Sequence, residues 1–550
     1  MIRENWRLVL LVVFVIAAAV ALFAPPLGGG TANATAAPTA DGPTTLRFGL
    51  DLSGGTRIRA PLVGLTAEGV DVAPGNQANV SQEVATALNV SAADVQVRTG
   101  NGSATVEVFP ERVTGPESAD GPDNVSQAEF ARALQSAGLD VSTDDISEGV
   151  TDQTYETAVN TLENKINEAG LTGGTVRTVQ SAGERYIQIE VPNRNRSEVR
   201  DLVTSQGRVT TVAYFPTGGN GTPEYCEPES WTNATSNGTV PDGYCSVAVL
   251  ESQEAFGTIQ PVTRDESGQP VVPVTLTDEA AGRFTKAMQR FGFADPANAS
   301  TCRFERSRTG HCLLTVVDEQ VVYAASIQGG ERGLVRPFAT GDFENDPSYQ
   351  TSATNVSEAQ ELRVNLQAGA LPARLNLDAG TSQFILPSLA QKFKTFSLVT
   401  GLIAVLAVAV TVFVRYRDPR VAAPMVVTAL SEVFILLGFA SAVGLALDLS
   451  HIAGFIAVIG TGVDDLVIIA DEILQSDVKT GRVFQSRFRR ALWVIGAAAA
   501  TTIVAMSPLA VLSLGDLQGF AIVTIVGVLI GVLITRPAYG NVLRNLVTDG

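Results

Sequence analysis

The strongest constraint on the fold is an apolar run at residues 452–474 that contains two adjacent aspartates, Asp464 and Asp465. The run is about long enough to cross the roughly 30 Å hydrocarbon layer of a membrane as a helix. A helix that enters the layer near residue 452 carries Asp464 about 18 Å down, close to mid-bilayer. An ionised carboxylate is costly there, and such an acid normally faces a protein interior or a wet cavity. The pair therefore predicts an ion-coupling site.

The two acids could instead be neutral, or hydrogen-bonded to neighbouring helices, and merely hold a bundle together. Adjacent side chains point about 100° apart on a helix and do not share one partner easily, which favours a site that takes up and loses an ion. Asp471 and Glu472 recur seven residues later on the same faces. They could extend a polar track, although acids at a helix end are usually solvated.

Six apolar segments predict six membrane helices, at residues 8–24, 396–414, 421–442, 450–474, 491–512 and 517–535. The first segment could be a cleaved signal peptide, but its length favours a retained helix. Arg-rich connections alternate with Arg-free ones, so the positive-inside rule predicts cytoplasmic termini and an external region at 25–395. No Lys or Arg lies inside these predicted segments. We therefore expect the aspartates to be protonated or to meet a cation from another subunit.

Other polar residues at a useful depth are Glu432, Thr501 and Thr502, which we expect to neighbour the aspartates. Isolated polar residues of this kind also serve simply as packing contacts between helices. Gly527 and Gly531 lie four residues apart in the last segment and predict a face for close helix packing.

The charge divides the chain into two parts. The formal net charge is −18, yet from residue 396 onward ten Lys or Arg balance ten Asp or Glu, so the excess acid lies in the first 395 residues. Five lysines beside thirty-three arginines, together with this acidity, are typical of a halophile's protein surface. Phosphate binding needs clustered positive charge, which argues against nucleic acid as a partner.

Four cysteines, Cys226, Cys245, Cys302 and Cys312, lie in the acidic part. An even number in loop-like sequence indicates two local disulfides, most simply 226 with 245 and 302 with 312, although three pairings are formally possible. Zinc is the alternative, but the spacing without clustered histidines does not favour it, and we predict no metal site. Eleven Asn-x-Ser/Thr sequons lie at or before residue 355, which agrees with an external location.

These patterns predict a multi-domain α-helical membrane protein with six transmembrane helices and a large external α+β domain. After a linker, residues 151–216 follow the order α, β, β, α, β, with strands at 175–180, at 185–191, where Ile187, Ile189 and Val191 alternate inward, and at 208–215. The same order returns near residue 271 and closes with a strand at 371–377, which predicts two ferredoxin-like halves made by duplication. Units of α and β also recur by chance. The expected parts are a first transmembrane helix at 1–24, a linker at 25–45, an accessory α+β region at 46–150, a ferredoxin-like half at 151–216, a Cys-containing insertion at 217–270, a second α/β half at 271–395 and a five-helix membrane domain at 396–550.

Several motifs resemble the SecD/SecF family of protein-export membrane proteins, a branch of the resistance-nodulation-division superfamily. GLDLSGG at 49–55 resembles the family's external motif after the first membrane helix, through Gly49, Asp51, Gly54 and Gly55. Further similar stretches are LENKINEAGL (162–171), IQIEVP (187–192), VDEQVVYAASI (317–327), LQAGALPARL (366–375), IAGFIAVIGTGVDD (452–465) and GFAIVTIVGVLIGVLITR (519–536).

The resemblance has two departures. Bacterial members resemble AVDAN where this chain has GVDDL, so Asp464 matches the candidate ion-coupling acid and Asp465 does not. The double aspartate is similar instead to the fourth helix of the wider superfamily. The region 60–148, the cysteine insertion and the sequons are not carried by the bacterial pattern, and with the acidity they resemble a haloarchaeal version.

The resemblance implies a SecF-like partner with six helices of its own, a position beside the SecY channel and a role in moving unfolded preproteins, driven by protons or sodium. It implies no enzyme activity and no cofactor, and the chain shows no nucleophile motif or phosphate loop. The alternative is a half-size efflux or lipid transporter of the same superfamily, which predicts an apolar ligand tunnel. A single set of six helices and scattered external aromatic residues favour the export function.

Overall fold

The structure is a computed structural model of the 550-residue chain. It describes residues 6–24, 44–73, 75–100, 103–110, 112–114, 124–171, 173–181, 183–217, 231–233, 236–238, 243–250, 255–265, 267–318, 320–330, 333–474, 481–511 and 516–548. The chain forms two compact units. The first unit contains Met1–Ala60, Thr172–Val199 and Gly380–Gly550, and the second contains Pro61–Leu171 and Arg200–Ala379.

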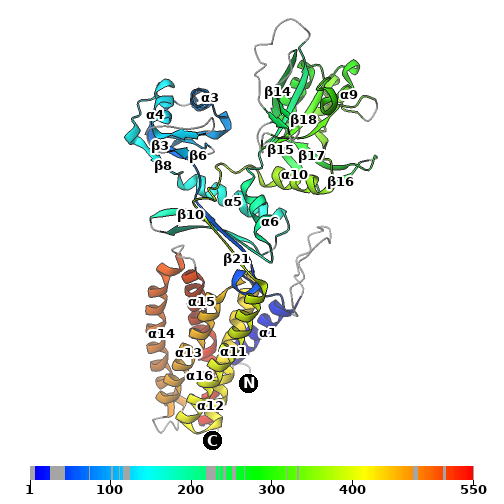
Figure 1. Cartoon of the computed structure of the whole chain (residues 1–550). Helices are drawn as coiled ribbons and strands as arrows, with labels where there is room; N and C mark the ends of the chain where they lie inside the picture. The colour runs from blue at the N-terminus through cyan, green and yellow to red at the C-terminus, as the bar shows by residue number, and fades with distance from the viewer. Residues whose placement is uncertain are drawn as a thin grey trace. The chain divides into compact units, whose positions relative to one another are not determined.

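Six helices of the first unit are long and apolar enough to cross a membrane, in agreement with the prediction. They are α1 (Trp6–Phe23), α11 (Pro387–Tyr416), α12 (Pro419–Ala442), α13 (Leu449–Leu474), α14 (Gly481–Val511) and a last helix built from α15 (Asp516–Ile530), a π-helical turn η6 (Gly531–Thr535) and α16 (Arg536–Thr548). In Figure 1 the start of α1 and the end of α16 lie toward the same end of the bundle, whereas β21 leads into α11 at the opposite end.

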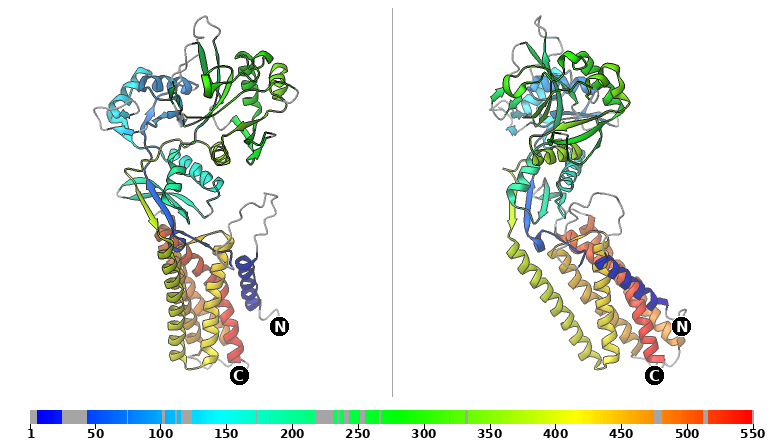
Figure 2. Two further views of the ribbon diagram at one scale, coloured as in Figure 1. Left: turned by 45° about the vertical axis from the view of Figure 1, so that its right-hand side comes forward. Right: turned by 90° about the vertical axis from the view of Figure 1, so that its right-hand side faces the viewer.

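Small residues allow close approach where these helices pack. A side chain at Gly438 of α12 would overlap Ala18 of α1, and one at Gly454 of α13 would come within 2.9 Å of Val523 of α15. Large apolar side chains of the same helices, such as Leu398 and Trp493, are exposed, as expected for surfaces that meet lipid. The side-by-side helices are visible in both views of Figure 2.

A four-stranded antiparallel sheet of the first unit, the base sheet, is ferredoxin-like. Its order is β21 (Thr381–Ile385), β2 (Gly55–Ala60), β10 (Glu184–Pro192) and β9 (Thr175–Ser181). Along the chain α5 (Asp152–Glu168) lies between β2 and β9, and α6 (Arg196–Thr204) lies between β10 and β21. The chain order is thus βαββαβ, and the strands lie in the order 4-1-3-2.

The predicted closing strand of this sheet was therefore wrong. Ile187, Ile189 and Val191 alternate as expected, and the register pairs Ile187 with Ala60 and Ile189 with Ile58. The last strand is β21, not the segment at 208–215, because a long part of the chain is inserted between α6 and β21. Long insertions cost little loop entropy, so sequence neighbours need not pair.

A second ferredoxin-like sheet lies in the accessory region of the second unit. It orders β4 (Val95–Gly100), β5 (Ser103–Val108), β3 (Leu65–Val70) and β8 (Ile146–Glu148), with α3 (Gln77–Leu88) after β3 and α4 (Gln127–Ser136) before β8. The strand order is again 4-1-3-2. The predicted recurrence of this topology is present, but in different segments from those expected. β6 (Arg112–Thr114) and β7 (Asn124–Ser126) form a separate parallel pair.

The remainder of the second unit contains two further sheets. One orders β13 (Ser236–Gly238), β12 (Trp231–Asn233), β19 (Gln320–Ala325), β18 (Cys312–Val317), β11 (Val209–Pro216) and β14 (Tyr244–Leu250). The other contains β15 (Phe256–Ile259), β16 (Thr263–Arg264), β17 (Pro270–Leu276) and β20 (Ser348–Ser352). The helices of this part are α7 (Asp278–Arg290), α8 (Phe304–Ser307), α9 (Val335–Thr340) and α10 (Val356–Ala368).

Residues 271–395 consequently do not form one half with a single sheet, because β17 and β18 belong to different sheets. The strand expected at 371–377 is reduced to one bridge between Leu62 and Leu375. The disulfide between Cys302 and Cys312 is confirmed. Cys245 in β14 is also disulfide-bonded, and its expected partner Cys226 lies outside the described residues.

Candidate functional site

The two aspartates of α13 face different surroundings, as their 100° separation requires. Asp465 points into the bundle, where its Oδ2 accepts a hydrogen bond of 3.2 Å from Nε of Arg536. Asp464 is exposed on the outer face of α13 and has no hydrogen bond or ion pair to any residue that the structure describes. The acid that matches the family pattern is therefore the exposed one, and its neighbour is the partly buried one that faces the bundle.

Arg536 is the centre of a buried cluster that joins three parts of the bundle. Its Nη1 donates to Oε2 of Glu432 in α12 and, at 2.8 Å, to Oγ1 of Thr535 in η6. The Thr535 hydroxyl in turn donates to the same Glu432 oxygen at 2.9 Å. The side chains of Arg536 and Glu432 are each 2% exposed, whereas that of Asp465 is 22% exposed. We call Glu432, Asp465, Thr535 and Arg536 the Arg536 cluster.

The expectation that no cation lies inside the membrane helices was wrong. The last apolar segment was predicted to end at residue 535, because Arg536 and Arg544 indicate an Arg-rich cytoplasmic connection. The structure continues the spanning helix to Leu546 and takes Arg536 into it. The signal that was missed is the apolar pattern beyond the arginine, where Ala538, Tyr539 and Leu543 are buried.

Two glycines make room for the guanidinium group. A side chain at Gly531 would overlap Nη1 of Arg536, so only glycine fits one turn before it. A Cβ at Gly462 of α13 would lie 3.3 Å from Nη2 of Arg536 and 3.4 Å from Oε2 of Glu432. Gly527 is different, because a Cβ there would overlap Val458 of α13. The two glycines that we predicted to pack helices thus meet different neighbours, a charged group and an apolar side chain.

Thr501 and Thr502 do not bond to the Arg536 cluster in the part of the chain that is described. Their hydroxyls donate to the Ala498 carbonyl of their own helix, at 2.8 Å and 2.9 Å. Asp471 and Glu472 are also paired elsewhere. Asp471 accepts from Arg415 at 2.8 Å, and Glu472 accepts from Arg487 at 2.9 Å. Of the predicted neighbours of the aspartates, only Glu432 is therefore in the cluster.

The cluster contains one oxygen without a partner. Oε1 of Glu432 is buried and meets no hydrogen-bond donor among the described residues. One guanidinium group also faces two carboxyl groups, so full ionisation would leave a buried charge without a counter-ion, which costs several kcal/mol. An arrangement of this kind is suited to hold a proton, or another small cation, on one of its carboxyl groups.

The external motif at 49–55 forms a tight connection into the base sheet. Gly54 and Gly55 have φ angles of 76° and 135°, a region that favours glycine. The backbone N–H of Gly49 donates to the Leu447 carbonyl at 2.8 Å, and Asp51 lies 3.8 Å from Arg57. The motif thereby holds the chain between the bundle and β2.

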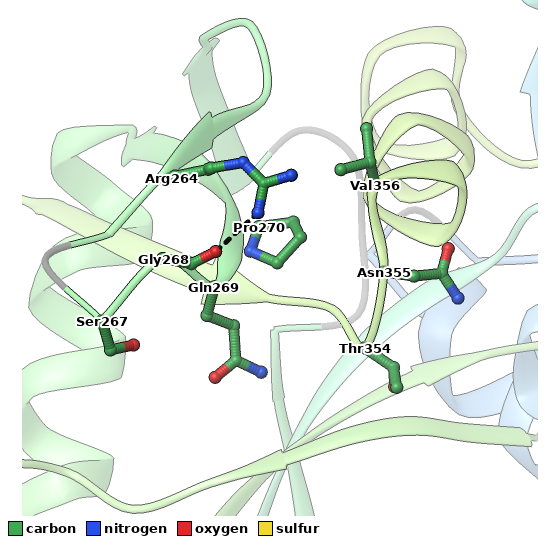
Figure 3. Close-up of a pocket in the computed structure, with 8 residues that line it drawn as sticks. All are labelled: Arg264, Ser267, Gly268, Gln269, Pro270, Thr354, Asn355 and Val356. Carbon is green, nitrogen blue, oxygen red and sulfur yellow. Dashed lines mark hydrogen bonds between the residues drawn. The ribbon is translucent and has the colours of Figure 1, made fainter.

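The second unit carries a surface pocket with a volume of about 480 Å³. Figure 3 shows that its residues come from the β16–β17 hairpin and the start of α10. Its arginine, Arg264, donates to the Gly268 carbonyl at 2.7 Å, and Asn355 caps α10 by accepting from the backbone of Glu358 at 3.0 Å. The lining residues are Arg264, Ser267, Gly268, Gln269, Pro270, Thr354, Asn355 and Val356.

Known proteins similar to this chain are described as protein-export or protein-translocase subunits. The family model "Protein export membrane protein SecD/SecF, C-terminal" matches residues 372–544. The chain is 49% identical to "Protein-export membrane protein SecD" of Haloferax volcanii, over 100% of this chain and 99% of that protein. The chain belongs to the SecD family. The protein of the same description from Haloquadratum walsbyi is also 49% identical, over 99% of each chain.

Membership in the SecD family confirms the resemblance seen in the motifs, and the relatives come from halophiles, as the acidic composition predicted. It does not favour the efflux or lipid transporter that was the alternative. A solved structure of SecDF from Thermus thermophilus covers 100% of this chain with 19% identity and a TM-score of 0.46. The chain spans 59% of that SecDF chain.

Proposed function

We propose that this chain is a non-enzymatic subunit of the Sec protein-export apparatus, and that its membrane helices couple an ion gradient to the movement of preproteins. Its SecD family membership supports the role in export. The observation that carries the coupling is the Arg536 cluster, in which two carboxyl groups compete for one buried guanidinium beside the exposed Asp464.

The competition provides two states. When Asp465 is ionised it shares Arg536 with Glu432, and when Asp465 takes up a proton the guanidinium is held by Glu432 and Thr535 alone. Asp465 lies on α13 and Glu432 on α12, so the exchange alters the force between these helices. One charge moving through 100 mV supplies about 2.3 kcal/mol, enough to shift such an equilibrium about fifty-fold.

The partner is a SecF-like membrane subunit that covers the Asp464 face of α13. Thr461, Asp464 and Ile468 lie on one side of that helix and are all exposed in the single chain. A carboxylate in a membrane helix faces protein or water rather than lipid, so this face needs a protein neighbour. In the complete apparatus the termini are cytoplasmic, residues 25–395 are external, and the assembly works beside the SecY channel on unfolded preproteins.

The coupling is tested in a strain whose only copy of the gene carries Asp464→Asn, Asp465→Asn or Glu432→Gln. Secretion of a reporter preprotein is measured together with the amount of each variant in the membrane. We expect each variant to be present at a normal level and to lower the secretion rate by up to about fifty-fold. The matched control is Asp471→Asn, a carboxyl group on the same helix that pairs with Arg415 outside the cluster. Normal secretion by the Asp464, Asp465 and Glu432 variants would refute the coupling.

A further inference from the structure

The residue that directly precedes α13 is a further acid, the partly buried Asp448, which contacts the external motif. β1 (Arg47–Phe48) pairs in parallel with β22 (Ala446–Leu447), which precedes α13. The chain then turns through the short helix α2 (Leu50–Ser53) into β2 of the base sheet. The base sheet is therefore connected to α13 through α2 and the β1–β22 pair, which all belong to the first unit.

The Asp448 carboxyl group fills the space at the start of α2. A side chain at Gly49 would overlap this carboxyl group, so glycine is required for the contact. The backbone N–H of Asp51 donates to Oδ1 of Asp448 at 3.5 Å. The backbone N–H of Asp448 donates to Nδ1 of His451 at 3.1 Å, which leaves that ring nitrogen in its acceptor form.

Charged groups from five elements surround this joint. Asp51 of α2 and Glu190 of β10 are acids, and Arg57 of β2 lies between them, 3.8 Å from Asp51 and 2.7 Å from Glu190. Arg177 of β9 is 3.5 Å from Glu190, and Lys394 of α11 lies 3.8 Å from the centre of the Phe48 ring. Near Asp448 itself the other carboxyl groups are the main charged neighbours. Burial, with help from the charges of Glu190 and Asp51, raises the pKa of Asp448 to about 7, although the hydrogen bond from the Asp51 backbone N–H and the charge of Arg57 oppose the shift.

We propose that Asp448 is a positioning residue for coupling: its protonated carboxyl group holds the α2 turn against the start of α13, and its ionised form loosens that contact. The link to transport rests on the proposed function, because it requires that α13 respond to ions at Asp464 and Asp465. The joint itself is defined by Gly49, Asp51 and Asp448 and does not depend on that function.

The direction of the pH effect follows from the raised pKa. A carboxyl group that binds its proton more tightly in the docked joint than in the open joint favours docking when it is protonated. This contribution is complete below the ordinary pKa near 4 and is lost as the pH rises through about 7. The α2 turn should therefore open more often at alkaline pH.

The test is amide hydrogen exchange of the full chain in lipid nanodiscs between pH 5.5 and 8.5, corrected for the intrinsic pH dependence of exchange. We expect the opening equilibrium of residues 47–54 to rise about ten-fold or more across this range. Asp448→Asn keeps the acceptor oxygen without the charge, and we expect it to stay closed at every pH. A flat wild-type profile, or an Asp448→Asn profile equal to that of the wild type, would overturn the proposal.

Two further variants separate packing from charge. Gly49→Ala should open the joint at every pH, because its Cβ has no room beside the carboxyl group. Adding Asp448→Ala removes both the overlap and the group that titrates, so the exchange of residues 47–54 in the double variant should not depend on pH. If the double variant keeps the pH dependence of the wild type, the proposed contact is wrong. Exchange of β10, measured in the same experiment, shows whether each variant is folded.

The proposed function and this joint can fail separately. Asp464→Asn should leave the pH profile of residues 47–54 unchanged, because Asp464 is sixteen positions from Asp448 along α13. A normal joint profile with normal secretion by the cluster variants would refute the ion coupling alone. A flat joint profile with impaired secretion by Asp464→Asn would refute the joint alone.

Discussion

Two buried glutamates, one in each unit, are bound to an arginine in different ways. Glu107 of β5 accepts on both oxygens: Oε2 from Arg98 and, at 2.8 Å, from Thr154, and Oε1 from the Thr151 backbone at 2.7 Å. Glu432 of α12 receives both its donors on Oε2, and its Oε1 meets none among the described residues. A buried carboxylate whose two oxygens both accept hydrogen bonds has a structural role. A carboxylate with one oxygen that accepts none, and with a second acid competing for its arginine, is able to change its partner.

The largest expected effect is on Arg536, which two acids share. Arg536→Ala removes the only cation of the cluster and leaves Glu432 and Asp465 facing each other in the bundle. We expect the free energy of unfolding to fall by about 3–5 kcal/mol, as measured by denaturation of the purified chain in mild detergent. Arg536→Lys keeps the charge and is the control. A loss below 1 kcal/mol for Arg536→Ala, on the scale of a surface substitution, would show that the cluster is open to water.

The structural role of Glu107 is tested by Glu107→Gln. The new amide NH₂ must face a donor, because both oxygens of Glu107 now accept, and the charged bond to Arg98 is lost. We expect a loss of about 2–3 kcal/mol in the stability of the accessory sheet, measured by hydrogen exchange of β3 and β5. Secretion per folded molecule should not change. If Glu107→Gln lowers secretion while hydrogen exchange of β3 and β5 is unchanged, Glu107 has a role in transport and the structural role assigned to it is wrong.

The same substitution at Glu432 should have the opposite effects, with little change in stability and a loss of secretion. Glu432→Gln keeps an acceptor for Arg536 and Thr535, and its NH₂ takes the place of the oxygen that has no donor. We expect a change in stability below about 1 kcal/mol, measured by the same denaturation, together with impaired secretion. If Glu432→Gln destabilises the bundle as much as Glu107→Gln destabilises the accessory sheet, both glutamates have the same structural role.

The smallest effect is expected for Thr501→Ala and Thr502→Ala. Each hydroxyl bonds only to the carbonyl of Ala498 in its own helix, among the residues described. Removing such a bond should change stability by less than about 0.5 kcal/mol and leave secretion unaltered. If secretion falls in either variant, α14 is part of the ion path, and the affected threonine belongs to the coupling site together with the Arg536 cluster.

Patterns that repeat within a single element were predictable. The six spanning helices follow from apolar length alone, because a helix satisfies its backbone internally whatever surrounds it. The alternation of Ile187 and Ile189 predicted β10, and the short spacing predicted the disulfide between Cys302 and Cys312. The strand that closes the base sheet was not predictable in this way, because β2 and β21 are separated by most of the second unit.

The sequence by itself determined that an acid pair lies inside a membrane helix and that the chain resembles protein-export subunits, because both are readable from contiguous residues. Only the tertiary structure decided which acid faces the bundle, and that Arg536 is its partner. Residues 465 and 536 are brought together by packing of α13 against the last helix, with glycine at 462 and 531 leaving space for the guanidinium. Helix propensity and hydropathy describe one helix at a time, and a contact between helices depends on the facing surfaces of both.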